Sequence, residues 1–199
     1  AIFVAGDSAG GGLALSMAIY LRDHPEEGLE IAGISTVSPY TDLTCSGRSY
    51  TTRRWVEGGA GSRDPVFRDP NPTQASMPMV YRLLGAPGEA GAVPPQDSPL
   101  AVVFAQDLSG LPPTQIHVGD TEVMLSDSTV YARRAWEAGS PVELTVWPRM
   151  WHTFTQYTEG CGGEGAAPLR DAILALRMQG QYLRRLAAEV APGAPLAEP

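Results

Sequence analysis

Apolar residues gather in four short runs, and these runs predict the strands of the protein. They cover residues 1–5, 31–39, 114–119 and 142–148. The first three runs are mostly apolar throughout, which is typical of strands buried on both faces of a parallel sheet. The fourth run alternates Val142, Leu144 and Val146 with Glu143 and Thr145. This alternation indicates a strand at the sheet edge, with one face nearer to water.

Helical periodicity fills the stretches between and after the runs. The predicted helices cover residues 9–22, a part of 71–85, 126–138 and 168–188. The apolar stripe of the last helix consists of Leu169, Ile173, Leu176 and Leu183. Strands that alternate with helices predict the fold class α/β, in which a mostly parallel sheet carries helices on both faces.

Length and composition fit one domain with a buried core. The 199 residues are 43% hydrophobic and 18% charged. We expect this domain to cover residues 1–188 and to be followed by a disordered tail at 189–199, which is rich in Ala and Pro. No apolar stretch is long enough to span a membrane. The net charge is −8 and no basic cluster is interleaved with aromatic residues, so nucleic acid is not expected as a partner.

The cysteines give no sign of a metal site. Cys45 and Cys161 match neither zinc-ligand nor C-x-x-C spacing, and we interpret them as two free thiols rather than a disulfide pair. The sequence therefore predicts no metal and no cofactor. Because no signal peptide is visible, the expected location is cytoplasmic.

One short segment suggests chemistry. Gly6-Asp7-Ser8-Ala9-Gly10 follows the first apolar run and precedes the first predicted helix. This G-x-S-x-G pattern is typical of a nucleophile elbow, where a sharp strand-to-helix turn exposes the serine hydroxyl and the flanking glycines relieve crowding. The Ala9 N–H, in the first helical turn, is a candidate oxyanion donor. The alternative interpretation is a glycine-rich turn that only packs the helix on the sheet.

A serine nucleophile needs a base, and the chain has three histidines. His24 lies in a polar loop, and His117 lies inside a buried strand, where a structural role is usual. His152 follows the last strand, where the base of an elbow enzyme is expected, so we choose His152. Trp151 and Phe154 flank it and are candidates for the wall of a substrate pocket, although simple aromatic packing explains them equally well.

The acid that orients the base should follow the third apolar run, because elbow enzymes place it between the serine and the histidine. Asp120, Glu122 and Asp127 compete for this role. Asp120 lies very close to the strand end. Asp127 lies at the start of a helix, where a carboxylate stabilises the helix by itself. We favour Glu122, which has a longer arm in the turn, and keep Asp127 as the alternative.

Several segments together resemble the hormone-sensitive-lipase-like group of α/β-hydrolases, the microbial family IV esterases. The matching segments are GDSAGG (6–11), SPYTDLT (38–44), DSPL (97–100), residues 107–128, residues 138–154 and the closing helix. The resemblance implies that residues 1–188 form part of a catalytic domain, with Ser8 as nucleophile and His152 as base. It also implies that Glu122 of Glu-Val-Met-Leu is the acid, and that the substrates are small esters with short- to medium-chain acyl groups.

The chain departs from this family at its front. Family members carry an upstream His-Gly-Gly-Gly stretch that supplies oxyanion donors, a cap, and strands before the elbow. None of these is found here, so we expect the C-terminal part of an α/β-hydrolase, with only the Ala9 N–H as an evident oxyanion donor. The first strand would then present an unpaired edge, which predicts self-association or pairing with an N-terminal segment.

Three alternative functions stay open from the sequence. One is a catalytically impaired fragment. Another is a non-catalytic small-molecule binder of the same fold. The third is a hydrolase of amides, lactones or carbamates, because the same catalytic residues serve all of these leaving groups.

Overall fold

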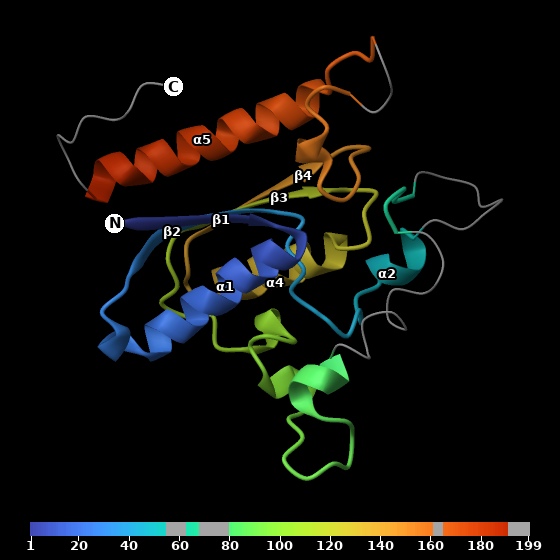
Figure 1. Ribbon diagram of the computed structural model, residues 1–199. Helices are drawn as coiled ribbons and strands as arrows, with labels where there is room; N and C mark the ends of the chain where they lie inside the picture. Colours follow the sequence, from blue (N-terminus) through green and yellow to red (C-terminus); the bar gives the residue numbers. More distant parts are fainter. Residues whose placement is uncertain (55–62, 68–79, 161–164, 191–199) are drawn as a thin grey trace.

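Four parallel strands form the sheet of the protein (Figure 1). The computed structural model describes residues 1–54, 63–67, 80–160 and 165–190. The strands are β1 (Ile2–Asp7), β2 (Ile31–Val37), β3 (Thr114–Gly119) and β4 (Val142–Trp147), in the spatial order β1-β2-β3-β4. All three strand pairs are parallel, which confirms the predicted fold class.

The named helices are α1 (Ser8–Asp23), α2 (Ser49–Thr52), α4 (Leu125–Glu137) and α5 (Arg170–Val190), and three of them cover the two faces of this sheet. Helices α1 and α4 lie on one face and α5 lies on the other (Figure 1). Short 3₁₀ turns cover Pro25–Glu27, Pro95–Asp97, Val103–Ala105 and Phe154–Gln156. Of the helix predicted within 71–85, residues 80–84 are helical, and the earlier part lies outside the described residues.

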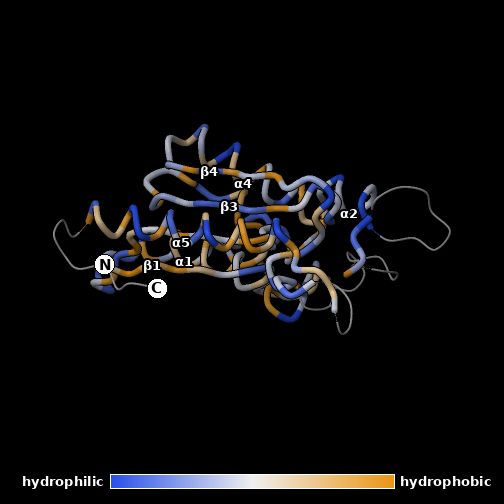
Figure 2. The backbone as a smooth tube through the Cα atoms, turned by 90° about the horizontal axis from the view of Figure 1, so that it is seen from above, coloured by the Kyte–Doolittle hydropathy of each residue, from blue (hydrophilic) through white to orange (hydrophobic). Residues whose placement is uncertain are grey.

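Two apolar clusters hold these layers together. The larger cluster lies between the sheet and helices α1 and α4, and its fully buried members include Leu15, Ile34 and Ile116. The second cluster joins Val37 of β2 and Phe154 to the inner face of α5. Figure 2 shows hydrophobic residues along β1 and along α1, which packs against this strand.

The buried face of α5 differs from the predicted one. The helix buries Ala172, Ala175, Tyr182 and Leu186. Leu176 of the predicted stripe is instead 44% exposed. Small alanines let the helix lie close to the sheet, and a Cβ at Gly33 of β2 would overlap the Leu186 side chain. Close packing on small residues therefore outweighed the larger side chains of the expected stripe.

Both ends of the sheet are edge strands. Among the described strands, β4 pairs with β3 alone, which confirms the edge position predicted from its alternation. The apolar face predicted for it is not buried, however, because Leu144 and Val146 are 36% and 42% exposed. Within the described sheet, β1 pairs with β2 alone, and its Ile2 side chain is 42% exposed.

Two predictions about the chain fall partly outside the described residues. The tail expected at 189–199 begins in helix, since α5 continues to Val190, and residues 191–199 lie beyond the described part. Cys45 is buried, and the Tyr40 hydroxyl lies 3.0 Å from its Sγ. Cys161 is not among the described residues, so the state of the two thiols stays a prediction.

Candidate active site

The turn between β1 and α1 holds Ser8 in a strained conformation. Ser8 has φ +53°, in the left-handed region that non-glycine residues rarely adopt. A Cβ at Gly6 would lie 2.5 Å from the Gly10 carbonyl oxygen, so no larger residue fits at position 6 without a backbone shift. The strand-to-helix turn and the need for glycine before the serine were both expected from the sequence.

The second glycine of the motif has a different role from the one expected. A Cβ at Gly10 would meet no atom within 4 Å, so the prediction that Gly10 relieves crowding is wrong. The close approach occurs two residues later, where a Cβ at Gly12 would overlap the carbonyl oxygen of Tyr40. Gly12 thus lets α1 pack directly on the loop that follows β2.

Three side chains that follow three different strands meet beside this turn. His152 Nε2 lies 2.9 Å from Ser8 Oγ, and His152 Nδ1 lies 2.9 Å from Glu122 Oε2. The residues follow β1, β3 and β4, and the carboxyl ends of parallel strands lie at one edge of the sheet, where ligands bind in such folds. Glu122 is completely buried and His152 is 4% exposed. The structure thus brings together the three residues that the sequence suggested.

Ser38 supports this arrangement from the loop after β2. Its hydroxyl donates a hydrogen bond of 2.8 Å to Glu122 Oε1, which also accepts the Gly119 N–H at 2.6 Å. The same hydroxyl accepts the N–H of Thr153 at 3.1 Å. Ser38 and Thr153 both have positive φ angles, of +50° and +52°. The sequence pointed to the segment that contains Ser38 but not to this role.

The alternative acid, Asp127, does not turn toward the histidine. Its Oδ2 accepts the backbone N–H groups of Thr41 and Asp42, each at 2.9 Å, and the side chain is 1% exposed. Burial raises the pKa of Asp127 well above its ordinary value, and the nearby Asp42 carboxylate raises it further. Asp127 therefore ties α4 to the loop after β2.

The aromatic residues around His152 differ from the expected ones. Phe154 is completely buried, with its ring 5.6 Å from that of Trp147 between centroids, so it belongs to the core and not to an open pocket. Trp151 is partly buried and packs edge-on against Tyr157 at 5.5 Å. The ring that contacts His152 is Phe67, at 4.9 Å and nearly perpendicular. No local sequence pattern marks Phe67.

The other two histidines lie in different surroundings. His117 is completely buried in β3, and its Nδ1 accepts the indole N–H of Trp147 at 3.0 Å. Burial lowers the pKa of His117 to about 4, so it is neutral near pH 7. His24 lies after α1 and stacks on the ring of Tyr20 at 4.1 Å.

The comparison with protein families agrees with this geometry. Residues 1–156 match the model of a family described as having the alpha/beta hydrolase fold. The chain belongs to this alpha/beta hydrolase family. Ala9 lies in the first turn of α1. Because of this position, its backbone N–H has no carbonyl acceptor within the helix.

Similar hydrolases place the chain in the hormone-sensitive-lipase-like group. It is 37% identical over 156 residues to an acetyl-hydrolase from Streptomyces hygroscopicus, covering 78% of this chain and 46% of the relative. It is 30% identical over 195 residues to the esterase LipU from Mycobacterium tuberculosis, covering 92% and 54%. The crystal structure of a hormone-sensitive lipase from a metagenome library matches with a TM-score of 0.70 and 33% identity, covering 92% and 54%. The chain spans about half the length of these relatives.

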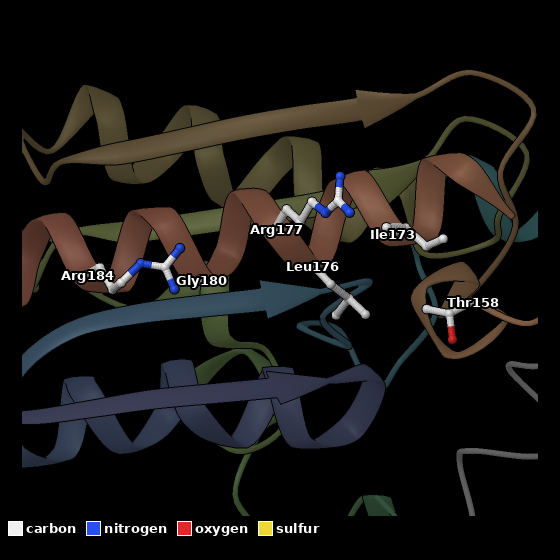
Figure 3. Close-up of a pocket in the computed structure, with 6 residues that line it drawn as sticks. All are labelled: Thr158, Ile173, Leu176, Arg177, Gly180 and Arg184. Atoms are coloured by element: carbon white, nitrogen blue, oxygen red, sulfur yellow. The ribbon is translucent and has the colours of Figure 1, made fainter. Parts of the chain in front are cut away.

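Within the described part of the chain, no three His, Cys, Asp or Glu side chains are grouped so that they could hold a metal ion. Among the described helices, none is both long and apolar enough to cross a membrane. A pocket lies along α5 (Figure 3) and is lined by Thr158, Ile173, Leu176, Arg177, Gly180 and Arg184, none of which belongs to the Ser8, Glu122 and His152 group.

Proposed function

We propose that this hydrolase chain carries the catalytic residues of a serine carboxylic-ester hydrolase. The observation that carries the proposal is the continuous pair of 2.9 Å contacts from Ser8 through His152 to Glu122. Similar proteins named acetyl-hydrolase and esterase support an ester as substrate. The resemblance to family IV esterases favours acyl groups of short to medium length.

In the proposed reaction, Ser8 Oγ attacks the ester carbonyl while His152 Nε2 takes its proton. Glu122 accepts the Nδ1–H, which fixes the tautomer of the ring and stabilises the imidazolium that forms. The Ala9 N–H stabilises the oxyanion. The alcohol leaves with the proton from His152, and an acyl-enzyme on Ser8 is then hydrolysed by a water that the same ring activates.

The edge of the sheet supports a second part of the proposal, which concerns association. In the part of the chain that the structure describes, β1 has a strand neighbour on one side, and its Ile2 side chain is exposed. On α1, Leu13, Met17 and Tyr20 recur at helical spacing and are 61%, 36% and 47% exposed. We expect this apolar face to pair with a second copy of the chain or with an N-terminal segment of a hydrolase. A stable monomer in size-exclusion chromatography with light scattering would oppose this.

A fluorophosphonate probe tests the catalytic proposal. We expect the probe to label the parent chain and not Ser8→Ala, and we expect turnover of p-nitrophenyl acetate and butyrate to require Ser8 as well. The control is Ser109→Ala, which removes a hydroxyl that donates to the nearby Asp107 carboxylate in a loop. Labelling that persists in Ser8→Ala would exclude this nucleophile.

The same measurements separate the alternative functions. Labelling without ester turnover would indicate an impaired catalyst, because the loss of one oxyanion donor typically lowers turnover by about 100- to 1000-fold. A chain that binds small molecules but shows neither labelling nor turnover would be a non-catalytic binder. Faster turnover of amide, lactone or carbamate substrates than of esters would reassign the leaving group.

A further inference from the structure

A third acidic residue lies against the Ser8, His152 and Glu122 site. Asp64 is completely buried, although it belongs to an irregular segment rather than to a strand or helix of the sheet. Its Oδ1 accepts the N–H of Val66 at 3.0 Å, and its Oδ2 accepts the N–H of Val123 at 3.1 Å. The second bond crosses 59 residues of sequence and reaches the turn that contains Glu122.

The backbone around Asp64 keeps its carboxylate in place. The Asp64 N–H donates to the carbonyl oxygen of Arg53 at 2.8 Å, and Asp64 pairs with Arg54 as an isolated parallel bridge. The Arg63 guanidinium donates to the carbonyl oxygen of Arg54 at 3.2 Å. The segment is therefore attached to the chain just before it, and the carboxylate points inward from this anchor.

The bond to Val123 acts directly on the acid. The N–H of Val123 belongs to the peptide group that joins it to Glu122, so a fixed acceptor for this N–H fixes the orientation of that peptide plane. The Glu122 carboxylate is held at its other end by Ser38 and Gly119. Both the backbone and the carboxylate of Glu122 are thus held in the position from which the side chain contacts His152.

The same segment also reaches the base. Phe67 lies three residues after Asp64, and its ring packs edge-on against the imidazole of His152 at 4.9 Å. Burial raises the pKa of Asp64, two backbone N–H groups lower it, and the positive charge of a protonated His152 would lower it as well. One irregular segment thus touches the acid turn through Asp64 and the base through Phe67.

We propose that Asp64 is a positioning residue for the ester hydrolysis, because its bond to the Val123 N–H keeps the Glu122 carboxylate aligned with His152 Nδ1. This inference rests on the proposed function of Ser8, Glu122 and His152. A role in forming a local turn does not explain the burial of Asp64 or its bond to the Val123 N–H. The exposed Asp107 forms the same turn bond, in which its Oδ1 accepts the Ser109 N–H at 2.9 Å. Burial and a second bond to a distant loop distinguish Asp64 from it.

The test compares Asp64→Asn and Asp64→Ala with the control Asp107→Asn. The first measurement is the proton NMR resonance of His152 Nδ1–H, assigned by its loss in His152→Gln and its change in Glu122→Gln. The second is the rate constant of fluorophosphonate labelling at Ser8. Near-ultraviolet circular dichroism reports whether each variant keeps its packing.

In Asp64→Ala we expect the Nδ1–H resonance to move or broaden and the labelling rate to fall by about 10- to 100-fold, as a small misplacement of a catalytic group typically causes. In Asp64→Asn, whose amide oxygen can still accept one of the two N–H groups, we expect a smaller change in the same direction. Asp107→Asn should match the parent in both measurements.

Two outcomes would overturn the proposal. One is a parent-like resonance and labelling rate in both Asp64 variants, while Glu122→Gln changes the resonance. The other is an equal change in Asp107→Asn. If Asp64→Ala loses its packing, Asp64→Asn decides. If the parent chain is not labelled at all, the proposed function fails, and the resonance still decides whether Asp64 positions Glu122.

Discussion

The Ser38 hydroxyl donates a 2.8 Å hydrogen bond to Glu122 Oε1 from a backbone held at φ +50°. It also accepts the N–H of Thr153, the residue after His152. Ser38 is completely buried, so water cannot replace either bond without a rearrangement. A single hydroxyl thus connects the acid turn, the base loop and the loop after β2.

Ser38→Ala should therefore weaken both reactivity and stability. The substitution leaves the Thr153 N–H without its acceptor and removes one donor from Glu122, which should lower the free energy of unfolding by about 1–3 kcal/mol. We expect fluorophosphonate labelling of Ser8 to slow as well, because Glu122 is less firmly held. Urea denaturation and labelling kinetics measure the two effects. Ser109→Ala is the control, and an effect no larger than that control would contradict this role.

Glu122→Gln and Asp127→Asn separate the two candidate acids. Glu122→Gln keeps the shape but not the charge, and we expect the labelling rate to fall by about 1000- to 10000-fold, as for other serine hydrolases that lose the orienting carboxylate. Asp127→Asn keeps an oxygen for the N–H groups of Thr41 and Asp42, so its labelling rate should stay within about tenfold of the parent. The reverse order of losses would make Asp127 the acid.

Gly6→Ala and Gly10→Ala should change the free energy of unfolding in opposite directions. At Gly6 the new Cβ would lie 2.5 Å from backbone atoms, so the turn must distort and the free energy of unfolding should fall. At Gly10 the Cβ meets nothing within 4 Å, and alanine favours a helix over glycine by up to about 1 kcal/mol. Thermal or urea unfolding of both variants measures this. A large destabilisation by Gly10→Ala would contradict the prediction.

His117 should make the folded chain less stable in acid. Its pKa is lowered to about 4 in the folded state, from an ordinary value of 6.5, so the unfolded chain binds the proton more readily between these values. As the pH falls from 7 toward 4, the free energy of unfolding should decrease by about 3 kcal/mol at most through this residue. The stabilising contribution is complete above pH 6.5 and is lost as the pH falls through 4.

The control for this pH dependence is His117→Gln, whose amide oxygen can still accept the Trp147 indole N–H. The buried Asp64 and Asp127 have raised pKa values and act in the opposite direction over part of the same range. Because they are present in both proteins, their contribution cancels in the difference. Parallel pH profiles of the free energy of unfolding in the parent and the variant would contradict this account of His117.

The sequence predicted the parts of the fold that short-range patterns encode. Apolar runs marked all four strands, and the glycines and the serine of residues 6–10 marked the sharp turn. The contact face of α5 was misjudged because size alone does not decide packing. Ala172 and Ala175 allow a closer approach to the sheet than the leucines of the expected stripe would.

The candidate site also has residues that the sequence predicted and residues that it did not. Chain order and reach indicated Ser8, Glu122 and His152, since each follows a predicted strand. Asp64 and Phe67 were missed because their contacts come from chain folding over 59 and 85 residues, for which no local pattern exists. Gly10 was misread because the motif itself does not reveal that the close approach falls on Gly12.

Three residues at this site, Ser8, Ser38 and Thr153, hold left-handed backbone angles between +50° and +53°. Each such residue costs roughly 1–3 kcal/mol, and it persists only because its neighbours leave it no other conformation. Substitutions that relax this strain at Ser8 or Thr153 should raise the thermal stability of the chain and lower its reactivity. At Ser38 the loss of the two hydrogen bonds of its hydroxyl outweighs the relief of strain, so a change there weakens both properties. Engineering for thermal stability at the expense of reactivity should therefore begin at the other two positions.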